Sequence, residues 1–138
     1  KTDVLIGDKP GEAGLHARLS DVAFIGGSLC STGAHNPLDA VMCGCAGLTG
    51  ANIDYHRDLY QPLIQGGGVK LVKDPAMLAG AVNFLLKNSQ ARQDMARAGA
   101  RAVEQMRGAL ARTLREIEPF VHPLVVKARL EENGAVRR

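Results

Sequence analysis

Residues 21–43 join an apolar segment, a loop of small residues and a helix start, in that order. The first five of these residues have the composition of a buried strand, and the loop that follows is rich in glycine and serine. Asn36 and Pro37 favour a helix N-terminus, with Asn36 as the cap and Pro37 at the first helical position. Backbone amides left free at a helix start, beside a glycine-rich loop, can bind an anion. Asp39 lies one turn into the same helix, where its carboxylate could accept hydrogen bonds from sugar hydroxyls.

Strand and helix patterns alternate along most of the chain. The predicted strands are residues 3–7, 21–25, 46–49 and 69–72. The predicted helices are residues 12–19, 36–43, 54–65 and 74–87, followed by a helical segment over residues 89–118. Asp74 is the expected cap of the fourth helix, and Pro119 and Pro123 are expected to end the last segment. This order predicts an α/β fold with a parallel sheet of about four strands, flanking helices and a helical C-terminus.

The charges are distributed unevenly over the 138 residues. Residues 1–69 carry 4 basic and 7 acidic side chains, whereas residues 70–138 carry 13 basic and 7 acidic side chains. The basic half could face an anionic membrane or a phosphorylated substrate, but a solvated helical surface is the favoured interpretation for most of these charges. Trp is absent and aromatic residues make up 4% of the chain, which argues against base stacking along a sheet. No apolar run approaches the roughly 18 residues that a membrane span needs.

The cysteine and histidine residues predict no metal site. Cys43 and Cys45 are separated by one residue, whereas zinc sites and thioredoxin-like sites use two. The cysteines are interpreted as reduced, small apolar residues. Neither a metal nor a cofactor is therefore expected. The remaining histidines outside the loop are expected to be structural or at the surface: His16, His56 and His122.

In an open parallel sheet, ligands bind beyond the carboxyl ends of the strands. The predicted loops at that edge are residues 8–12, 26–36 and 49–54, and all three contain small or polar residues. Gly11 would let a ligand approach the backbone closely, although a simple tight turn is an equal interpretation. His35 could donate to a phosphate or merely close its loop. Further candidates for ligand contact in the same loop are Gly27 and Ser28.

At these residues the chain resembles the C-terminal domain of the 3-deoxy-D-manno-octulosonic acid (Kdo) transferases. The similar runs are GDKPGEAGL at residues 7–15, SDVAFIGGSL at 20–29, GAHNPLD at 33–39 and RGAL at 107–110. The resemblance implies one of the two Rossmann-like halves of a GT-B glycosyltransferase. It also implies transfer of Kdo from CMP-Kdo to a lipid A precursor, with inversion, at the cytoplasmic face of the bacterial inner membrane. The family usually reaches that membrane through an N-terminal anchor.

The resemblance also implies the residues that contact CMP. They are Pro10, Gly11, Glu12, Asn36, Pro37, Leu38 and Asp39. The family commonly has Glu where this chain has Asp39, which is one methylene shorter. The family's Gly-Lys-Pro-Val is replaced here by residues 44–47, and its Gly-Pro-His by residues 50–52. The family's catalytic Glu belongs to the N-terminal domain, so no catalytic residue is assigned and no turnover is expected.

The resemblance further predicts how this chain is organised and what it associates with. Residues 1–118 are expected to form the CMP-sugar-binding half and residues 119–138 a tail. Because the chain starts at Lys1 within a predicted strand, it is expected to be a soluble fragment of a longer protein. The strands of this chain would correspond to the third to sixth of a six-stranded half. In a sheet of order 3-2-1-4-5-6 without its first two strands, the strand at residues 3–7 would have no neighbour. An unpaired strand favours pairing with another chain, so a dimer or strand exchange is expected.

Two other functions are compatible with these patterns. One is a GT-B domain that uses a UDP-sugar or a GDP-sugar, because its phosphate loops would be similar. The other is a non-catalytic interaction module, in which the basic segment of residues 92–115 binds a partner or an anionic membrane.

Overall fold

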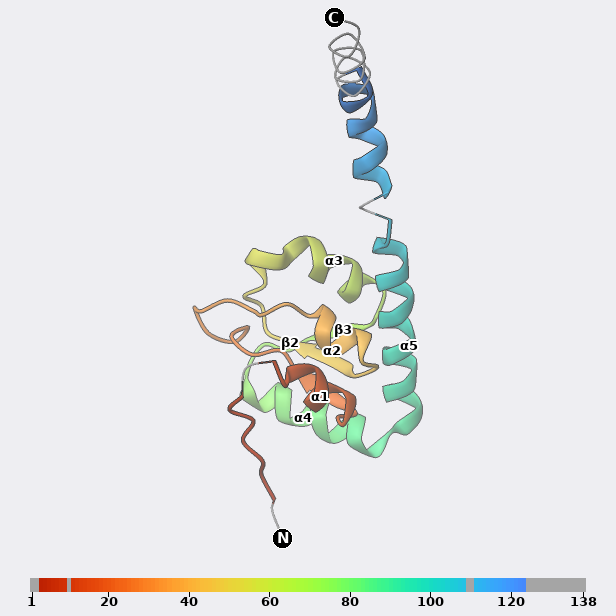
Figure 1. Ribbon diagram of the computed structural model, residues 1–138. Coiled ribbons are helices and arrows are strands. Elements are labelled where there is room, and N and C mark those ends of the chain that lie inside the picture. Colours follow the sequence, from red (N-terminus) through yellow and green to blue (C-terminus); the bar gives the residue numbers. More distant parts are fainter. Residues whose placement is uncertain (1–2, 10, 109–110, 124–138) are drawn as a thin grey trace, which may run out of the picture. The chain divides into compact units, whose positions relative to one another are not determined.

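A computed structural model describes residues 3–9, 11–108 and 111–123 (Figure 1). The chain divides into two compact units, residues 1–105 and residues 106–138, and each is considered by itself. The boundary expected after residue 118 stays a prediction. Pro10, one of the expected CMP contacts, lies outside the described residues.

The first unit is built on a parallel three-stranded sheet. Its strands are β1 (Val22–Phe24), β2 (Ala46–Thr49) and β3 (Val69–Leu71). They lie in the order β1-β2-β3, with Val22 opposite Ala46 and Gly47 opposite Val69. The predicted α/β fold and parallel sheet are confirmed, and three of the predicted strands are present.

Residues 3–7 do not form the fourth predicted strand. The side chains of Val4, Leu5 and Ile6 are 78%, 78% and 83% exposed. Within the described part of the chain, no strand lies beside them to pair with their backbone groups. An extended segment becomes a stable strand only when a neighbour satisfies its N–H and C=O groups. An apolar pattern at these positions is therefore not enough to form a strand.

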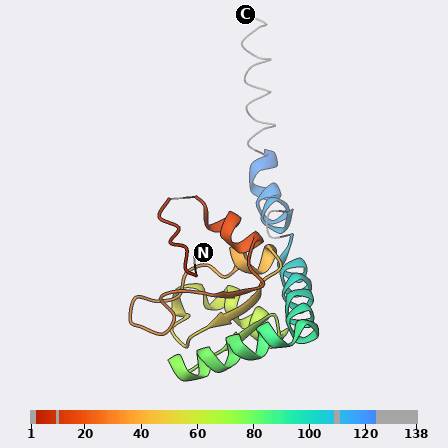
Figure 2. The same ribbon diagram turned by 90° about the horizontal axis from the view of Figure 1, so that it is seen from below.

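Helices cover both faces of the sheet. They are α1 (Ala13–Arg18), α2 (Leu38–Met42), the 3₁₀ turn η1 (Asp54–His56), α3 (Arg57–Gln65), α4 (Pro75–Lys87) and α5 (Ser89–Met106). Figure 2 shows α4 (green) on one side of the sheet and the segment with α1 and α2 (red to orange) on the other. On the α4 side, Leu48 and Val72 pack with Ala81 and Leu85 in one apolar cluster. On the other side, α2 contacts β2 and α3 contacts β3.

Local signals in the sequence set the helix starts and the approach of α5. The Asp74 carboxylate accepts a hydrogen bond from the backbone N–H of Met77 (2.7 Å), so the predicted cap of α4 is confirmed.

Gly68 follows the turn that ends α3. A Cβ on Gly68 would lie 2.3 Å from the Cα of Gly99 in α5, so the two backbones meet where neither residue has a side chain. Gly99 does not interrupt α5, because it is buried within the helix.

The second unit, as far as it is described, is helical over residues 111–123. Gly108, which lies between α5 and this segment in the sequence, adopts a positive φ of 94°. The expectation that Pro119 ends the helix is wrong, since residues on both sides of it are helical. Proline has a φ close to the helical value, and the surrounding residues are exposed, so water can bond the carbonyl group that lacks a proline N–H. No helix within the described ranges is both long and apolar enough to cross a bilayer.

Candidate functional site

The loop between β1 and α2 is joined by hydrogen bonds to the loop after β2. Ser28 is fully buried; its hydroxyl donates to the backbone oxygen of Ile25 (2.6 Å) and accepts from the backbone N–H of Gly50 (2.7 Å). The side chain of Asn52 donates to the backbone oxygen of Cys30 (2.7 Å). The backbone N–H of Asn52 donates to the backbone oxygen of Ser28 (3.0 Å). Both loops leave the carboxyl ends of neighbouring parallel strands. They therefore form one connected edge.

Two glycines allow the first loop to fold back on itself. Gly27 and Gly33 have positive φ values of 78° and 81°, a conformation that L side chains rarely adopt. A Cβ on Gly27 would lie 2.0 Å from the backbone oxygen of Gly33. The conformation of Gly27 is thus required for loop closure, whether or not it also contacts a ligand.

The start of α2 is held by its own sequence and by α3. The Asn36 side-chain oxygen accepts from the backbone N–H of Leu38 (3.0 Å), as expected of a cap. Pro37 is fully buried and already has helical angles, with φ −77° and ψ −18°. The hydroxyl of Tyr60 donates to the backbone oxygen of His35 (2.7 Å). The His35 backbone therefore helps close the loop, while its side chain remains exposed.

Two neighbouring hollows lie against α1 and α2. The first, called the helix hollow, has a volume of about 450 Å³ and is lined by Gly11, Ala13, Gly14, Arg18, Asp39, Met42 and Cys43. The second, called the strand hollow, has a volume of about 400 Å³, and its lining includes β1 and the adjoining loop. Ala13 and Asp39 line both hollows. Asp39 therefore borders both spaces.

The hollows bring together several of the residues predicted from the sequence. Gly11 lines the helix hollow, whereas His35 and Asn36 line the strand hollow. Asp39 is exposed and belongs to both. The other described candidates line neither hollow: Glu12, Gly27, Ser28, Pro37 and Leu38.

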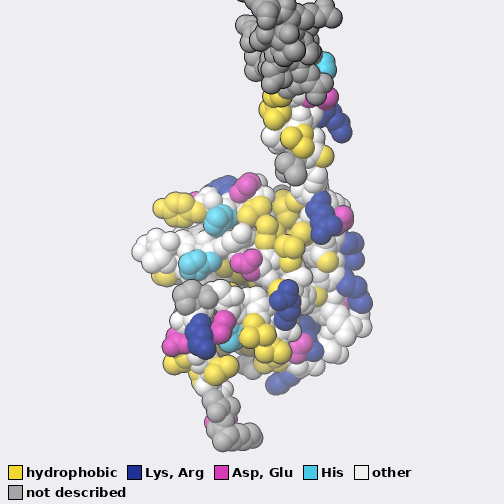
Figure 3. Space-filling model, in the orientation of Figure 1, with side chains coloured by type: hydrophobic (Ala, Val, Ile, Leu, Met, Phe, Trp, Pro, Cys, Tyr) yellow, Lys and Arg dark blue, Asp and Glu magenta, His cyan; other side chains and the backbone are white. Residues whose placement is uncertain are grey.

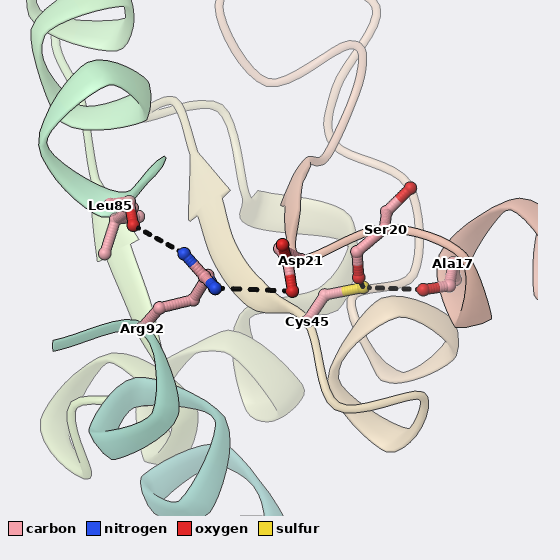
Figure 4. Close-up of polar contacts among 6 residues, drawn as sticks. All are labelled: Ala17, Ser20, Asp21, Cys45, Leu85 and Arg92. Carbon is pink, nitrogen blue, oxygen red and sulfur yellow. Dashed lines mark hydrogen bonds and ion pairs between the residues drawn. The ribbon is translucent and has the colours of Figure 1, made fainter. Parts of the chain in front are cut away.

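The position of α1 depends on a buried thiol at the start of β2. Figure 4 shows the Cys45 sulfur between two carbonyl groups at the end of α1, at 3.0 Å from the Ala17 oxygen and 3.3 Å from the Ser20 oxygen. Burial raises the pKa of the Cys45 thiol, so it remains a neutral donor. Beside it, Arg92 bonds the Asp21 carboxylate (3.3 Å) and the Leu85 backbone oxygen (3.0 Å), which links β1 to α4 and α5.

A second thiol lies in the exposed part of the loop. The Cys30 sulfur is 3.1 Å from the Thr32 hydroxyl, and this hydrogen bond lowers the pKa of the Cys30 thiol. Over the residues that the structure describes, no cluster of three or more metal-binding side chains is found.

Comparison with known proteins places the chain in a family. No protein-family model matches it. It is 35% identical over 121 residues to a 3-deoxy-D-manno-octulosonic acid transferase of Haemophilus influenzae, an alignment that covers 87% of this chain. The chain belongs to the Kdo transferase family. A Kdo transferase of Bordetella pertussis is 29% identical over 119 residues, or 86% of this chain. The chain spans 28% of the length of each of these relatives.

A solved structure supports the fold of this chain. It is the C-terminal CMP-Kdo-binding domain of WaaA from Acinetobacter baumannii, with a TM-score of 0.67 and 22% sequence identity. The match covers 70% of this chain and 51% of that structure. The predicted fold, that of a GT-B C-terminal half, is therefore confirmed, with three strands in its sheet rather than four.

Three residues that shape the site in this chain were not predicted from the sequence. Tyr60 and Asn52 close the loop, and Arg18 lines the helix hollow. For Arg18 a partial signal existed, because Gly14 and Arg18 are four residues apart and so share one face of α1, whereas Gly11 precedes that helix. Tyr60 and Asn52 had no comparable signal, since their partners lie 25 and 22 residues away along the chain.

Proposed function

We propose that this chain is the donor-binding part of a glycosyltransferase that moves Kdo from CMP-Kdo to a lipid A precursor in lipopolysaccharide synthesis. The observation that carries the proposal is the pair of hollows that Asp39 borders. Gly11, His35 and Asn36, each expected at the donor site, line one or the other. The names of the relatives, and of the CMP-Kdo-binding domain with the same fold, support this choice of donor.

The donor has parts that suit these two spaces. CMP-Kdo joins a cytidine and a phosphate to a sugar acid, so it is a long ligand with hydroxyl groups in its middle. Asp39 borders both hollows, and in this proposal its carboxylate accepts hydrogen bonds from the ribose hydroxyls. One end of the donor then lies along Gly11, where no side chain blocks the backbone. The other end lies near His35 and Asn36.

Transfer itself would require groups beyond those assigned to this chain. We assign no catalytic residue within the described part, and we place the base that activates the acceptor in the remainder of the parent protein. The acceptor, and the cytoplasmic face of the bacterial inner membrane, would be reached through that remainder. Transfer of Kdo by the purified 138-residue chain alone would contradict this assignment.

Calorimetric titration of the chain with CMP tests the proposal. We expect Asp39→Asn to weaken CMP binding by about tenfold or more, because a charged acceptor is lost. Asp39→Glu should retain binding, since it keeps the carboxylate. Asp58→Asn is the matched control, because Asp58 is exposed on α3 and lines neither hollow. Binding of UDP or GDP without binding of CMP would instead favour a different nucleotide sugar.

An interaction module is the second candidate. Figure 3 shows basic side chains (dark blue) along the α5 side of the first unit, which could face an anionic membrane. On α5, two cations already have partners, since Arg92 pairs with Asp21 and Arg97 pairs with Asp94. Their pairing reduces the charge available to a membrane. Liposome binding that is lost when Arg97 and Arg101 are replaced by Glu would support this candidate.

Self-association is a further proposal for the chain. The exposed apolar side chains at residues 4–6 could pair with a second copy, by strand exchange or by simple contact. Light scattering tests it: replacing Leu5 and Ile6 by Lys should yield a monomer, whereas a monomeric parent chain would contradict the proposal.

A further inference from the structure

The helix hollow has a lining suited to a flat ring with polar edges. Gly11, which precedes α1, and Gly14 within α1 carry no side chain, and a Cβ built on either residue would meet no atom within 4 Å. Met42, whose side chain is 62% exposed, and Cys43 form the α2 side. A flat ring could therefore lie against the α1 backbone with an apolar side chain next to it.

Arg18 is the single cationic residue among those that line either hollow. It is exposed, and within the described ranges it forms no ion pair and no side-chain hydrogen bond. It is the last residue of α1, whereas Asp39 lies on the α2 side of the same space. The guanidinium is therefore available to a ligand whose hydroxyl groups are held by Asp39.

We infer that Arg18 reads the edge of the nucleobase and selects cytosine over uracil. This inference rests on the proposed function, because it assigns one end of the donor to the helix hollow. Neutral cytosine presents two adjacent acceptors, N3 and O2, and a guanidinium presents two parallel N–H donors that match them. Uracil carries an N–H at N3, so a donor of the base would face a donor of the guanidinium. A site built this way rejects uracil because one N–H of the pair is left without an acceptor.

Recognition of the base by Arg18 and simple attraction of Arg18 to the phosphate predict different binding of CMP and UMP. CMP and UMP carry the same phosphate and the same ribose, so they differ only at the base. An arginine that contacts the phosphate would favour both nucleotides equally. A lysine keeps the positive charge but lacks the planar fork, so Arg18→Lys should preserve phosphate attraction and lose base selection.

The experiment is a calorimetric titration of the 138-residue chain, with CMP and UMP as the probes. We expect the parent chain to bind CMP at least about tenfold more tightly than UMP. Arg18→Ala and Arg18→Lys should both bring the two affinities within about twofold to threefold of each other, mainly by weakening CMP. Arg101→Ala is the control, because Arg101 is exposed on α5 and lines neither hollow. Circular dichroism of each variant confirms that it is folded.

Each alternative result has a definite meaning. Equal weakening of CMP and UMP by Arg18→Ala, with Arg18→Lys retaining both, would place the guanidinium on the phosphate and overturn the inference. An unchanged CMP-to-UMP ratio in both variants would also overturn it, while leaving the proposed function intact. Failure of the parent chain to bind CMP would overturn the proposed function and this inference together.

Discussion

Replacing Ser28 by Ala tests whether the donor-side loop is held by a buried hydroxyl. The hydroxyl bonds the backbone oxygen of Ile25 at 2.6 Å and the backbone N–H of Gly50 at 2.7 Å, and Ser28 is fully buried. Alanine removes both bonds and leaves an acceptor and a donor that water cannot easily reach. Each buried group left unpaired costs about 1–3 kcal/mol, and partial relaxation should offset some of that cost. We expect the free energy of unfolding to fall by about 2–4 kcal/mol.

Urea unfolding followed by circular dichroism measures this change. With a slope of about 2 kcal/mol per molar urea, the midpoint should fall by about 1–2 M. Ser20→Ala is a matched control, because the Ser20 hydroxyl also donates to a backbone oxygen, that of His16 at 2.7 Å, but is exposed. Water can replace that bond, so the control should change stability by less than about 0.5 kcal/mol. A Ser28→Ala midpoint equal to that of the control would refute the argument.

Four further substitutions test other parts of the structure. Gly68→Ala forces a Cβ to 2.3 Å from the α5 backbone and should cost about 1–3 kcal/mol. Gly80→Ala, whose Cβ meets no atom within 4 Å, should stabilise α4 by about 0.5–1 kcal/mol. A urea midpoint that does not fall for Gly68→Ala, or does not rise for Gly80→Ala, would contradict the respective prediction. Asp74→Ala removes the α4 cap and should cost about 1 kcal/mol by the same assay, and a neutral result would show that solvent substitutes for the cap. Because Thr32 lowers the pKa of the Cys30 thiol, iodoacetamide should alkylate Cys30 at lower pH in the parent chain than in Thr32→Val, and coincident pH profiles would argue against that hydrogen bond.

The sequence predicted most of what depends on a few neighbouring residues. Asp74 and Asn36 were identified as caps because a cap bonds an amide two or three residues away. The strands of the sheet were found because their apolar composition is local as well. Residues 3–7 show the same kind of pattern and yet form no strand, since a strand also needs a neighbour that the pattern does not specify. Pro119 failed as a stop signal for a different reason, because an exposed helix tolerates the loss of one backbone hydrogen bond.

The candidate site divides in the same way. Asn36 and Asp39 lie on or beside the helix that the sequence located, so their place at the sheet edge followed from the order of strands and helices. The inward orientation of Ser28 could not be predicted, because a serine in a glycine-rich loop can equally face a ligand. That Arg18 and Asp39 line one hollow depends on how α1 packs against α2, and α1 is held by Cys45 from another part of the chain.

The sequence by itself determined the order of strands and helices, the caps at Asn36 and Asp74, and the resemblance to the Kdo transferases. These follow from backbone geometry and side-chain chemistry within short stretches. The tertiary structure alone decided that Asp39 borders two hollows, and that Ser28 and Tyr60 support the loop from within. The physical reason is distance along the chain: these contacts join residues more than 20 positions apart, and their geometry exists only after the sheet has brought the loops together.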